Sequence, residues 1–142
     1  MPTEYVPDAD TLMRFVKWGH LRKDEDDNII GVNAHSFRLK PGEDFLSASW
    51  VEFFKTDDPL LSARRSFAKQ LTIRPKDRFA LGTVSVIKSA CSKHGVRVRV
   101  TREPEDGFEE HSGVRQFRDD KDELLDLLAA EAWAQLVTPA PP

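Results

Sequence analysis

Two histidines, His35 and His111, are each followed directly by a serine and lie in segments without helical periodicity. Side chains in extended or loop segments carry functions more often than side chains in helix cores. An imidazole exchanges protons near neutral pH, and an arginine such as Arg38 or Arg97 can hold a phosphate through paired N–H groups. His35, Arg38 and His111 are therefore the catalytic candidates, with the two rings as acid and base if they line one cleft. The alternative is that both histidines are surface or capping residues.

Positive charge is concentrated in the middle of the chain. Residues 62–102 carry 11 Lys and Arg and one acidic residue, whereas residues 1–61 carry 7 and 12, and residues 103–142 carry 3 and 11. The basic middle either faces an anionic partner or neutralises the acidic ends within one fold, and we favour the second reading. A pI near 5.8 also argues against a dedicated nucleic-acid-binding domain, for which a pI above ~9 is typical.

The strict alternation of valine and arginine over 96–100 predicts a strand with three valines on one face and two arginines on the other. Such a basic face can bind phosphate or an acidic protein surface. The candidate binding residues are Arg97, Arg99, Arg102, Arg65 and Lys69, the last two being an i,i+4 pair on one helix face. The alternative is that these arginines pair with acids of the C-terminal helix, for example Asp122, Glu123 or Asp126.

The sequence predicts no metal site and no cofactor. The histidines form no close pair of the HxxxH or HExxH kind, and residues 24–28 begin like a calcium loop but have Ile29 where that loop needs glycine. Cys91 falls on an apolar helical stripe, where a thiol is inert. Glycine-rich nucleotide motifs and the GxSxG motif are also missing, and the His-x-Ser/Thr spacing of paired-histidine phosphoesterases is not met.

The elements that must position these residues follow from periodicity and capping signals. Apolar spacing predicts a short helix within 12–18, helices over 59–71 and 83–94, and a C-terminal helix over 121–137 that begins with Asp120 and Glu123 as a capping box. Short strands are expected at 29–32, 37–39, 79–81, 96–100 and 113–117. Residues 47–54 fit either a strand or a buried helical turn.

These elements predict a single α+β domain over 1–137 and a frayed Pro-rich tail over 138–142. Its small mixed or antiparallel sheet should be covered mainly on one face by three or four helices. No apolar run approaches the ~20 residues of a membrane span, and the start of the chain does not resemble a secretory signal. With Cys91 as the only cysteine, we expect a cytoplasmic protein.

Four short segments form a pattern that runs through much of the chain: 37–39, 46–47, 50–54 and 111–114. In order and in type they resemble the FRL, LSxxWxEFF and HxGV segments of small uncharacterised bacterial proteins. The resemblance implies a bacterial cytoplasmic protein without implying an activity. It adds Trp50 and Glu52 to His35, Arg38 and His111 as candidates, although Trp50 also suits a core and Glu52 a partner for a buried arginine.

The leading hypothesis is therefore a binding or regulatory module that contacts an acidic macromolecule, protein or nucleic acid, through Arg97 and Arg99. The first alternative is a small phosphoryl-handling enzyme that uses His35 and His111. The second is a homo-oligomeric structural protein in which the basic middle of one subunit meets the acidic ends of another.

Overall fold

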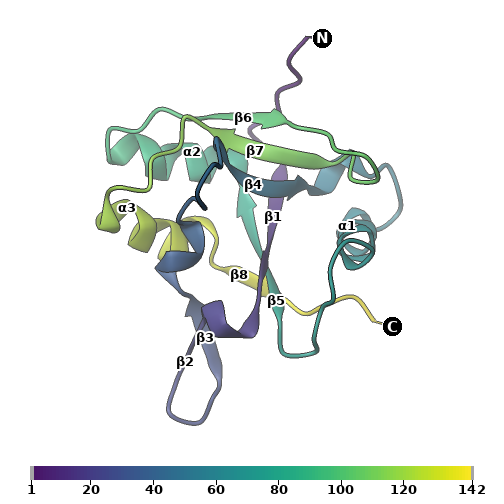
Figure 1. Cartoon of the computed structure of the whole chain (residues 1–142), viewed down its shortest axis with the longest axis vertical. Coiled ribbons are helices and arrows are strands. Elements are labelled where there is room, and N and C mark those ends of the chain that lie inside the picture. Colours follow the sequence, from purple (N-terminus) through teal and green to yellow (C-terminus); the bar gives the residue numbers. More distant parts are fainter. Residues whose placement is uncertain (1, 142) are drawn as a thin grey trace.

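The structure, a computed structural model, describes residues 2–141 of the 142-residue chain. Six strands form one sheet in the order β6-β7-β4-β1-β5-β8, and all neighbours run antiparallel. They are β1 (Thr11–Val16), β4 (Phe45–Trp50), β5 (Arg78–Thr83), β6 (Arg99–Arg102), β7 (His111–Arg115) and β8 (Gln135–Val137). The hairpin of β2 (Leu21–Lys23) and β3 (Ile29–Val32) projects separately (Figure 1). The α+β class and the antiparallel sheet are confirmed.

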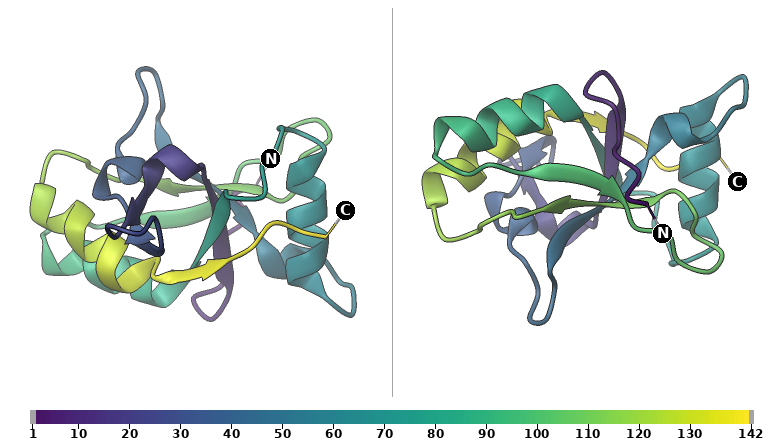
Figure 2. Two further views of the ribbon diagram at one scale, coloured as in Figure 1. Left: turned by 90° about the horizontal axis from the view of Figure 1, so that it is seen from below. Right: turned by 90° about the horizontal axis from the view of Figure 1, so that it is seen from above.

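Helices lie on both faces of this sheet. They are α1 (Pro59–Ala68), α2 (Val84–Lys93) and α3 (Asp122–Leu127). Leu12 and Val16 of β1 belong to the large core cluster that α2 and α3 also fill, whereas Met13 packs in a smaller cluster with Ala63 of α1. Successive strand residues point to opposite faces, so α2 and α3 cover one face together and α1 lies on the other (Figure 2). Most of the helical cover is thus on one face, as expected.

The helix expected within 12–18 is wrong, because these residues form the strand β1. β1 lies between β4 and β5 in the middle of the sheet, and Leu12 and Met13 are both fully buried on opposite faces. A strand that is buried on both faces has a nearly continuous apolar sequence instead of an alternating one. Such a run also contains apolar residues at helical spacing, which is why the sequence pattern of 12–18 predicts a helix.

The expected C-terminal helix is correct at its start and wrong at its end. α3 continues into the π-helical turn η4 (Leu128–Ala132), and residues 135–137 then form β8 on the open edge of β5. The expected capping box is not made, since Asp120 accepts a hydrogen bond from Arg118 and the position before α3 is Lys121. The buried Trp133 follows η4, and its packing against the core ends the helix where the leucine pattern alone would continue.

The remaining predictions are largely confirmed. α1 begins at Pro59 after Asp58, whose carboxylate accepts a hydrogen bond from the Leu61 amide, and it ends at Ala68, three residues before the expected end. α2 follows Thr83 and ends before Gly95, which has a φ of 73°. The segment 47–54 combines both alternatives, since β4 leads directly into the 3-10 turn η3 (Val51–Phe53).

Three expected strands are shorter or differently placed than predicted. The strand expected at 113–117 is β7, which begins at His111 and ends at Arg115. Over 96–100 the valines are buried and the arginines exposed, but pairing with β7 begins only at Arg99. Phe37 ends the 3-10 turn η2 (Ala34–Phe37), which Asn33 caps, so the extended backbone starts at Arg38. Among the described residues, no helix combines the length and apolar character that crossing a membrane requires.

The sheet divides at its centre. β1 and β4 pair only at Leu12 with Trp50 and at Met13 with Ser49, and beyond Met13 the two strands part. β1 continues along β5 as far as Val16, whereas the preceding part of β4 pairs with β7 (Figure 1). The fork between β1 and β4 leaves main-chain groups of β4 without a strand partner on that side, and a side chain of β1 fills this role.

Candidate functional site

A cleft of about 640 Å³ opens at the fork between β1 and β4. Its lining includes many nitrogen-bearing side chains from β1, from the turns after β1 and β3, and from β7: Arg14, Lys17, His20, His35, Arg38, Lys40 and His111. Glu43 is the single carboxylate among the residues that line it. The cleft therefore has a strongly positive potential and suits an anionic ligand.

Arg14 crosses the fork and forms the floor of the cleft. Its guanidinium donates hydrogen bonds to two main-chain carbonyls, those of Ser47 on β4 and of Ser36 on η2, the second with 2.6 Å between Nη2 and oxygen. The carbon Cζ lies 5.6 Å from the centre of the Phe37 ring. Burial lowers the pKa of Arg14 to about 10, against the opposing effect of the Glu43 carboxylate, so the side chain stays charged at neutral pH.

No carboxylate within residues 2–141 lies within 4.0 Å of the Arg14 guanidinium. A cation that is withdrawn from water without a counter-ion is costly, and natural proteins normally pair it. Two of the five N–H groups of Arg14 are used by the carbonyls of Ser47 and Ser36. Arg14 therefore has donors left over and no carboxylate in direct contact, although the charge of Glu43 acts on it from a distance.

His20 reports the same positive field. Its pKa is lowered first by partial burial and then by the charges of Lys17, Lys40 and Arg14. Burial and the neighbouring like charges both disfavour protonation of this imidazole. An anion bound among these residues would offset the part that the charges contribute.

His111 is nearly buried between the rings of Phe45 and Phe108, whose centres lie 5.8 and 5.2 Å from its own. Its Nδ1 lies 2.8 Å from the carbonyl oxygen of Glu103. A carbonyl can only accept a hydrogen bond, so Nδ1 carries a proton, and the Glu105 carboxylate lies 3.5 Å from the same nitrogen. In the neutral form of the ring the lone pair is therefore on Nε2. This tautomer is the one that a general base needs.

His35 has the opposite arrangement. Its Nδ1 accepts a hydrogen bond from Nε of Arg38 at 3.3 Å, which places the ring proton on Nε2. Arg38 is itself paired with Asp122, at 2.9 Å between Nη2 and Oδ1. The structure thus places His35, His111 and Arg38 around one cleft, as the enzyme alternative requires. The Arg38 contact suits His35 to donate a hydrogen bond to an anion, and not to give up a proton.

The basic residues of the middle segment do not form one surface. Arg97 precedes β6 and Arg99 is its first residue; both are exposed, and neither has an ion-pair partner in the described chain. Arg102 lies within 4.0 Å of carboxylates of Glu4 and Glu109. Arg65 and Lys69 line a different depression, against residues 138–141. None of the five pairs with Asp122, Glu123 or Asp126, so that alternative is not realised.

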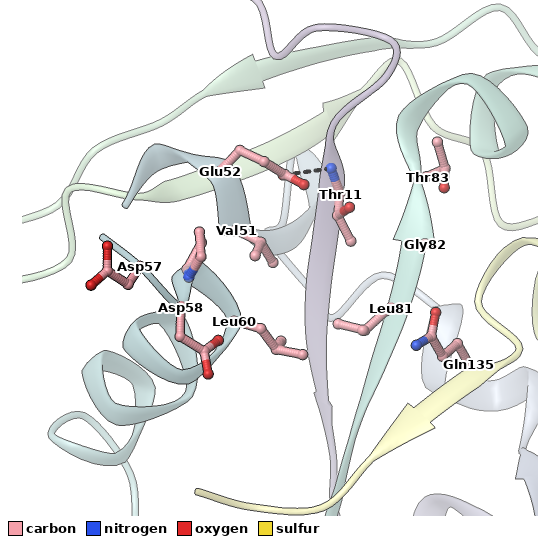
Figure 3. Close-up of a pocket in the computed structure, with 11 residues that line it drawn as sticks. Thr11, Val51, Glu52, Asp57, Asp58, Leu60, Leu81, Gly82, Thr83 and Gln135 are labelled. Atoms are coloured by element: carbon pink, nitrogen blue, oxygen red, sulfur yellow. Dashed lines mark hydrogen bonds between the residues drawn. The ribbon is translucent and has the colours of Figure 1, made fainter. Parts of the chain in front are cut away.

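The other carboxylates have local structural roles. In a depression between η3, α1 and β5, Glu52 accepts a hydrogen bond from the Thr11 amide at 2.7 Å, and Asp58 caps α1 (Figure 3). Trp50 is buried and donates from Nε1 to Asp10. Asp24 accepts from the amides of residues 26 and 28, which makes the calcium-like segment a closed turn.

Metal-binding and thiol chemistry have no support in the geometry. No group of three or more His, Cys, Asp or Glu side chains within the described residues is arranged to hold a metal ion. Burial raises the pKa of the Cys91 thiol to about 11, which agrees with its expected inertness.

Sequence reasoning missed Arg14, the central group of this cleft. The signal is a single arginine inside the apolar run of residues 12–16, where a charged residue needs a partner or a function. The prediction of a short helix over this run gave Arg14 no role. Lys17, His20 and Lys40 carry no recognisable motif and were missed with it.

Comparisons of the chain with models of protein families, with curated proteins and with solved structures find no match in any of the three. The pattern shared with small bacterial proteins therefore stays a prediction. Any function must be argued from the geometry of the cleft.

Proposed function

We propose that the protein binds a small molecule that carries a phosphoryl group, in the cleft between β1 and β4. The observation that carries this proposal is Arg14, a half-buried guanidinium that bonds only to neutral carbonyls. A bound oxyanion supplies the missing counter-charge and accepts from the unused N–H groups.

The rest of the lining supports a ligand of high negative charge. Lys17, Arg38 and Lys40 add three permanent cations to Arg14, of which Arg38 is paired with Asp122. Glu43 is the only carboxylate among the residues that line the cleft. Nε2–H of His35 adds a neutral donor. A phosphate monoester, with close to two negative charges at neutral pH, matches this excess better than a single carboxylate does.

Calorimetry with inorganic phosphate at low ionic strength tests the proposal. The unmodified chain should bind one equivalent, and Arg14→Met should weaken binding at least about tenfold, because a charge-assisted contact is lost. Arg118→Met is the matched control, since Arg118 is exposed, pairs with Asp120 and does not line the cleft.

The same experiment can overturn the proposal. If Arg14→Met does not fold by circular dichroism, the exposed pair Lys17→Gln/Lys40→Gln replaces it and should also weaken binding. Phosphate affinity that is unchanged in these variants, or that falls equally in Arg118→Met, excludes this cleft as the anion site.

Hydrolysis of an ester would extend the proposal, and it requires the phosphoryl group to lie beside His111, on the α1 face next to Phe108, instead of at Arg14. In that reaction Nε2 of His111 takes a proton from water, the water oxygen bonds to phosphorus, and the bond to the alcohol oxygen breaks. The proton then passes to the leaving alcohol oxygen, so atoms and charge balance. The observation that favours this extension is the His111 tautomer fixed by Glu103. Release of phenol from phenyl phosphate, lost in His111→Asn at unchanged phosphate affinity, would support it.

A second surface is proposed independently for an acidic macromolecule. Arg97 and Arg99 are exposed and free of ion pairs within residues 2–141, which favours an external partner over internal neutralisation at this place. Retention on a polyanion column should weaken with salt and disappear in Arg97→Glu/Arg99→Glu. Retention that is unaffected by both changes removes this candidate.

A further inference from the structure

The cleft has an apolar wall in addition to its cationic one. Phe15 of β1, Phe67 of α1 and Phe108 of the loop before β7 all line it, and each ring is only partly buried. The ring centres of Phe15 and Phe67 are 5.5 Å apart, and those of Phe67 and Phe108 are 5.8 Å apart. Leu71 extends this wall, and 51% of its surface is exposed.

The two walls belong to opposite faces of the sheet. Phe15 and Phe67 pack with the small cluster on the α1 side. Arg14 is the neighbour of Phe15 on β1, so it points to the other face, where it reaches η2 and the ring of Phe37. The fork between β1 and β4 joins the two sides into one cleft. A ligand that fills it therefore meets cations at one end and aromatic rings at the other.

The aromatic wall is available to a ligand because its rings do not fully cover one another. Phe67 and Phe108 meet edge to face, with 78° between their planes. The Phe108 ring in turn packs against the His111 ring at a tilt of 41°. Partly exposed aromatic faces and edges favour a further aromatic ring over an alkyl chain, because ring pairs gain from tilted and offset contacts. Leu71 supplies an apolar cover at the rim.

We propose that the ligand of this cleft is a phosphate monoester with an aromatic body, bound with its phosphoryl group at Arg14 and its ring among Phe15, Phe67 and Phe108. This inference rests on the proposed function and narrows its ligand class. A bare phosphate would leave the aromatic wall exposed to water, whereas an aromatic ester buries it.

Calorimetry with three probes tests this inference: inorganic phosphate, phenyl phosphate and benzoate. Phenyl phosphate should bind at least about tenfold more tightly than inorganic phosphate, because the ring removes apolar surface from water. It should also bind more tightly than benzoate, which has the same ring but a single charge. Arg14→Met should weaken phenyl phosphate and inorganic phosphate alike.

Variants of the apolar wall separate the ring from the phosphoryl group. Leu71→Ser and Phe108→Ala should each weaken phenyl phosphate several-fold more than they weaken inorganic phosphate. Ile30→Ser is the matched control, since Ile30 on β3 is 56% exposed, much like Leu71, and does not line the cleft. Leu71→Ser keeps the test valid if Phe108→Ala does not fold, because Leu71 is already half in solvent.

The outcomes distinguish failure of the aromatic ligand from failure of the phosphoryl-binding site. Equal affinity for phosphate and phenyl phosphate, or an equal loss of both in Leu71→Ser, overturns the aromatic ligand and leaves the phosphoryl site standing. Tighter binding of benzoate than of phenyl phosphate also overturns it. If neither phosphate compound binds, the proposed function fails as well.

Discussion

The side chain of Arg38 donates from Nε to Nδ1 of His35, whereas Nδ1 of His111 donates to the carbonyl of Glu103. The two imidazoles that line the cleft are therefore opposite tautomers, with the proton on Nε2 in His35 and on Nδ1 in His111. The nitrogen left over is a hydrogen-bond donor in His35 and carries a lone pair in the neutral form of His111. In the proposed function this asymmetry suits His35 to bind an anion and His111 to take up a proton.

The tautomers can be read directly from the nitrogen-15 chemical shifts of the two rings at pH 8. We expect the lone-pair shift at Nδ1 of His35 and at Nε2 of His111. Arg38→Ala should let His35 exchange between tautomers and leave His111 unchanged. The same tautomer in both rings would contradict the assignment.

The lowered pKa of His20 should make the stability of the fold depend on pH. Its pKa in the folded chain lies below the ordinary 6.5, through burial first and then the charges of Lys17, Lys40 and Arg14. Below pH 6.5 the unfolded chain therefore takes up the proton first, and folding stability falls as the pH falls through the folded pKa. Above pH 6.5 this contribution is fully present. Urea unfolding of His20→Gln should show a flatter dependence in that window.

Bound phosphate should raise the pKa of His20, because an anion among the lysines offsets the effect of their positive charges. The Cε1–H signal of His20, titrated with and without inorganic phosphate, measures this. A His20 that titrates at 6.5 or above in the free chain would contradict the cationic field of the cleft.

Gly82 of β5 should not tolerate a side chain. A Cβ there would lie 2.7 Å from the carbonyl oxygen of Ala132 and 3.0 Å from Trp133, and backbone cannot move aside cheaply. We expect Gly82→Ala to lower the free energy of unfolding by about 1–3 kcal/mol. Gly19→Ala is the control, since nothing lies within 4 Å of its Cβ position and the change should stay within about 0.5 kcal/mol. Urea unfolding compares them, and equal effects would contradict the close approach of η4 to β5.

Replacing the two aspartates that precede helices, Asp58 and Asp120, should change the free energy of unfolding by different amounts. Asp58 accepts from the Leu61 amide and caps α1, so Asp58→Ala should cost about 1 kcal/mol of unfolding free energy. Asp120 binds only the exposed Arg118 in front of α3, and Asp120→Ala should change stability by less than about 0.5 kcal/mol. Thermal or urea unfolding decides, and a larger loss in Asp120→Ala would show that a cap exists at α3 after all.

Local signals in the sequence were sufficient for much of the fold. The cap and proline at Asp58 and Pro59, the stripe of α2 with Gly95 after it, and the valine alternation before β6 each depend on neighbours in the chain. The errors lie where distant contacts decide. β1 is a strand because β4 and β5 flank it, and the last residues leave the helix because the edge of β5 is open to β8.

The candidate site was predictable in its parts but not as a whole. His35, Arg38 and His111 were found from residue type and segment, and the fold brings them to one cleft. Arg97 and Arg99 were correctly expected on an exposed face, whereas Arg65 and Lys69 line a separate depression. Arg14 could not be recognised, because its role depends on a fork between strands that no local pattern encodes.

The most direct measurement is the side-chain Nε–H signal of each arginine during titration with inorganic phosphate. The Arg14 signal should shift and saturate, while the signals of Arg97, Arg99 and the control Arg118 stay in place at the same concentrations. A saturable shift at Arg97 and Arg99 with none at Arg14 would contradict the anion site at the fork.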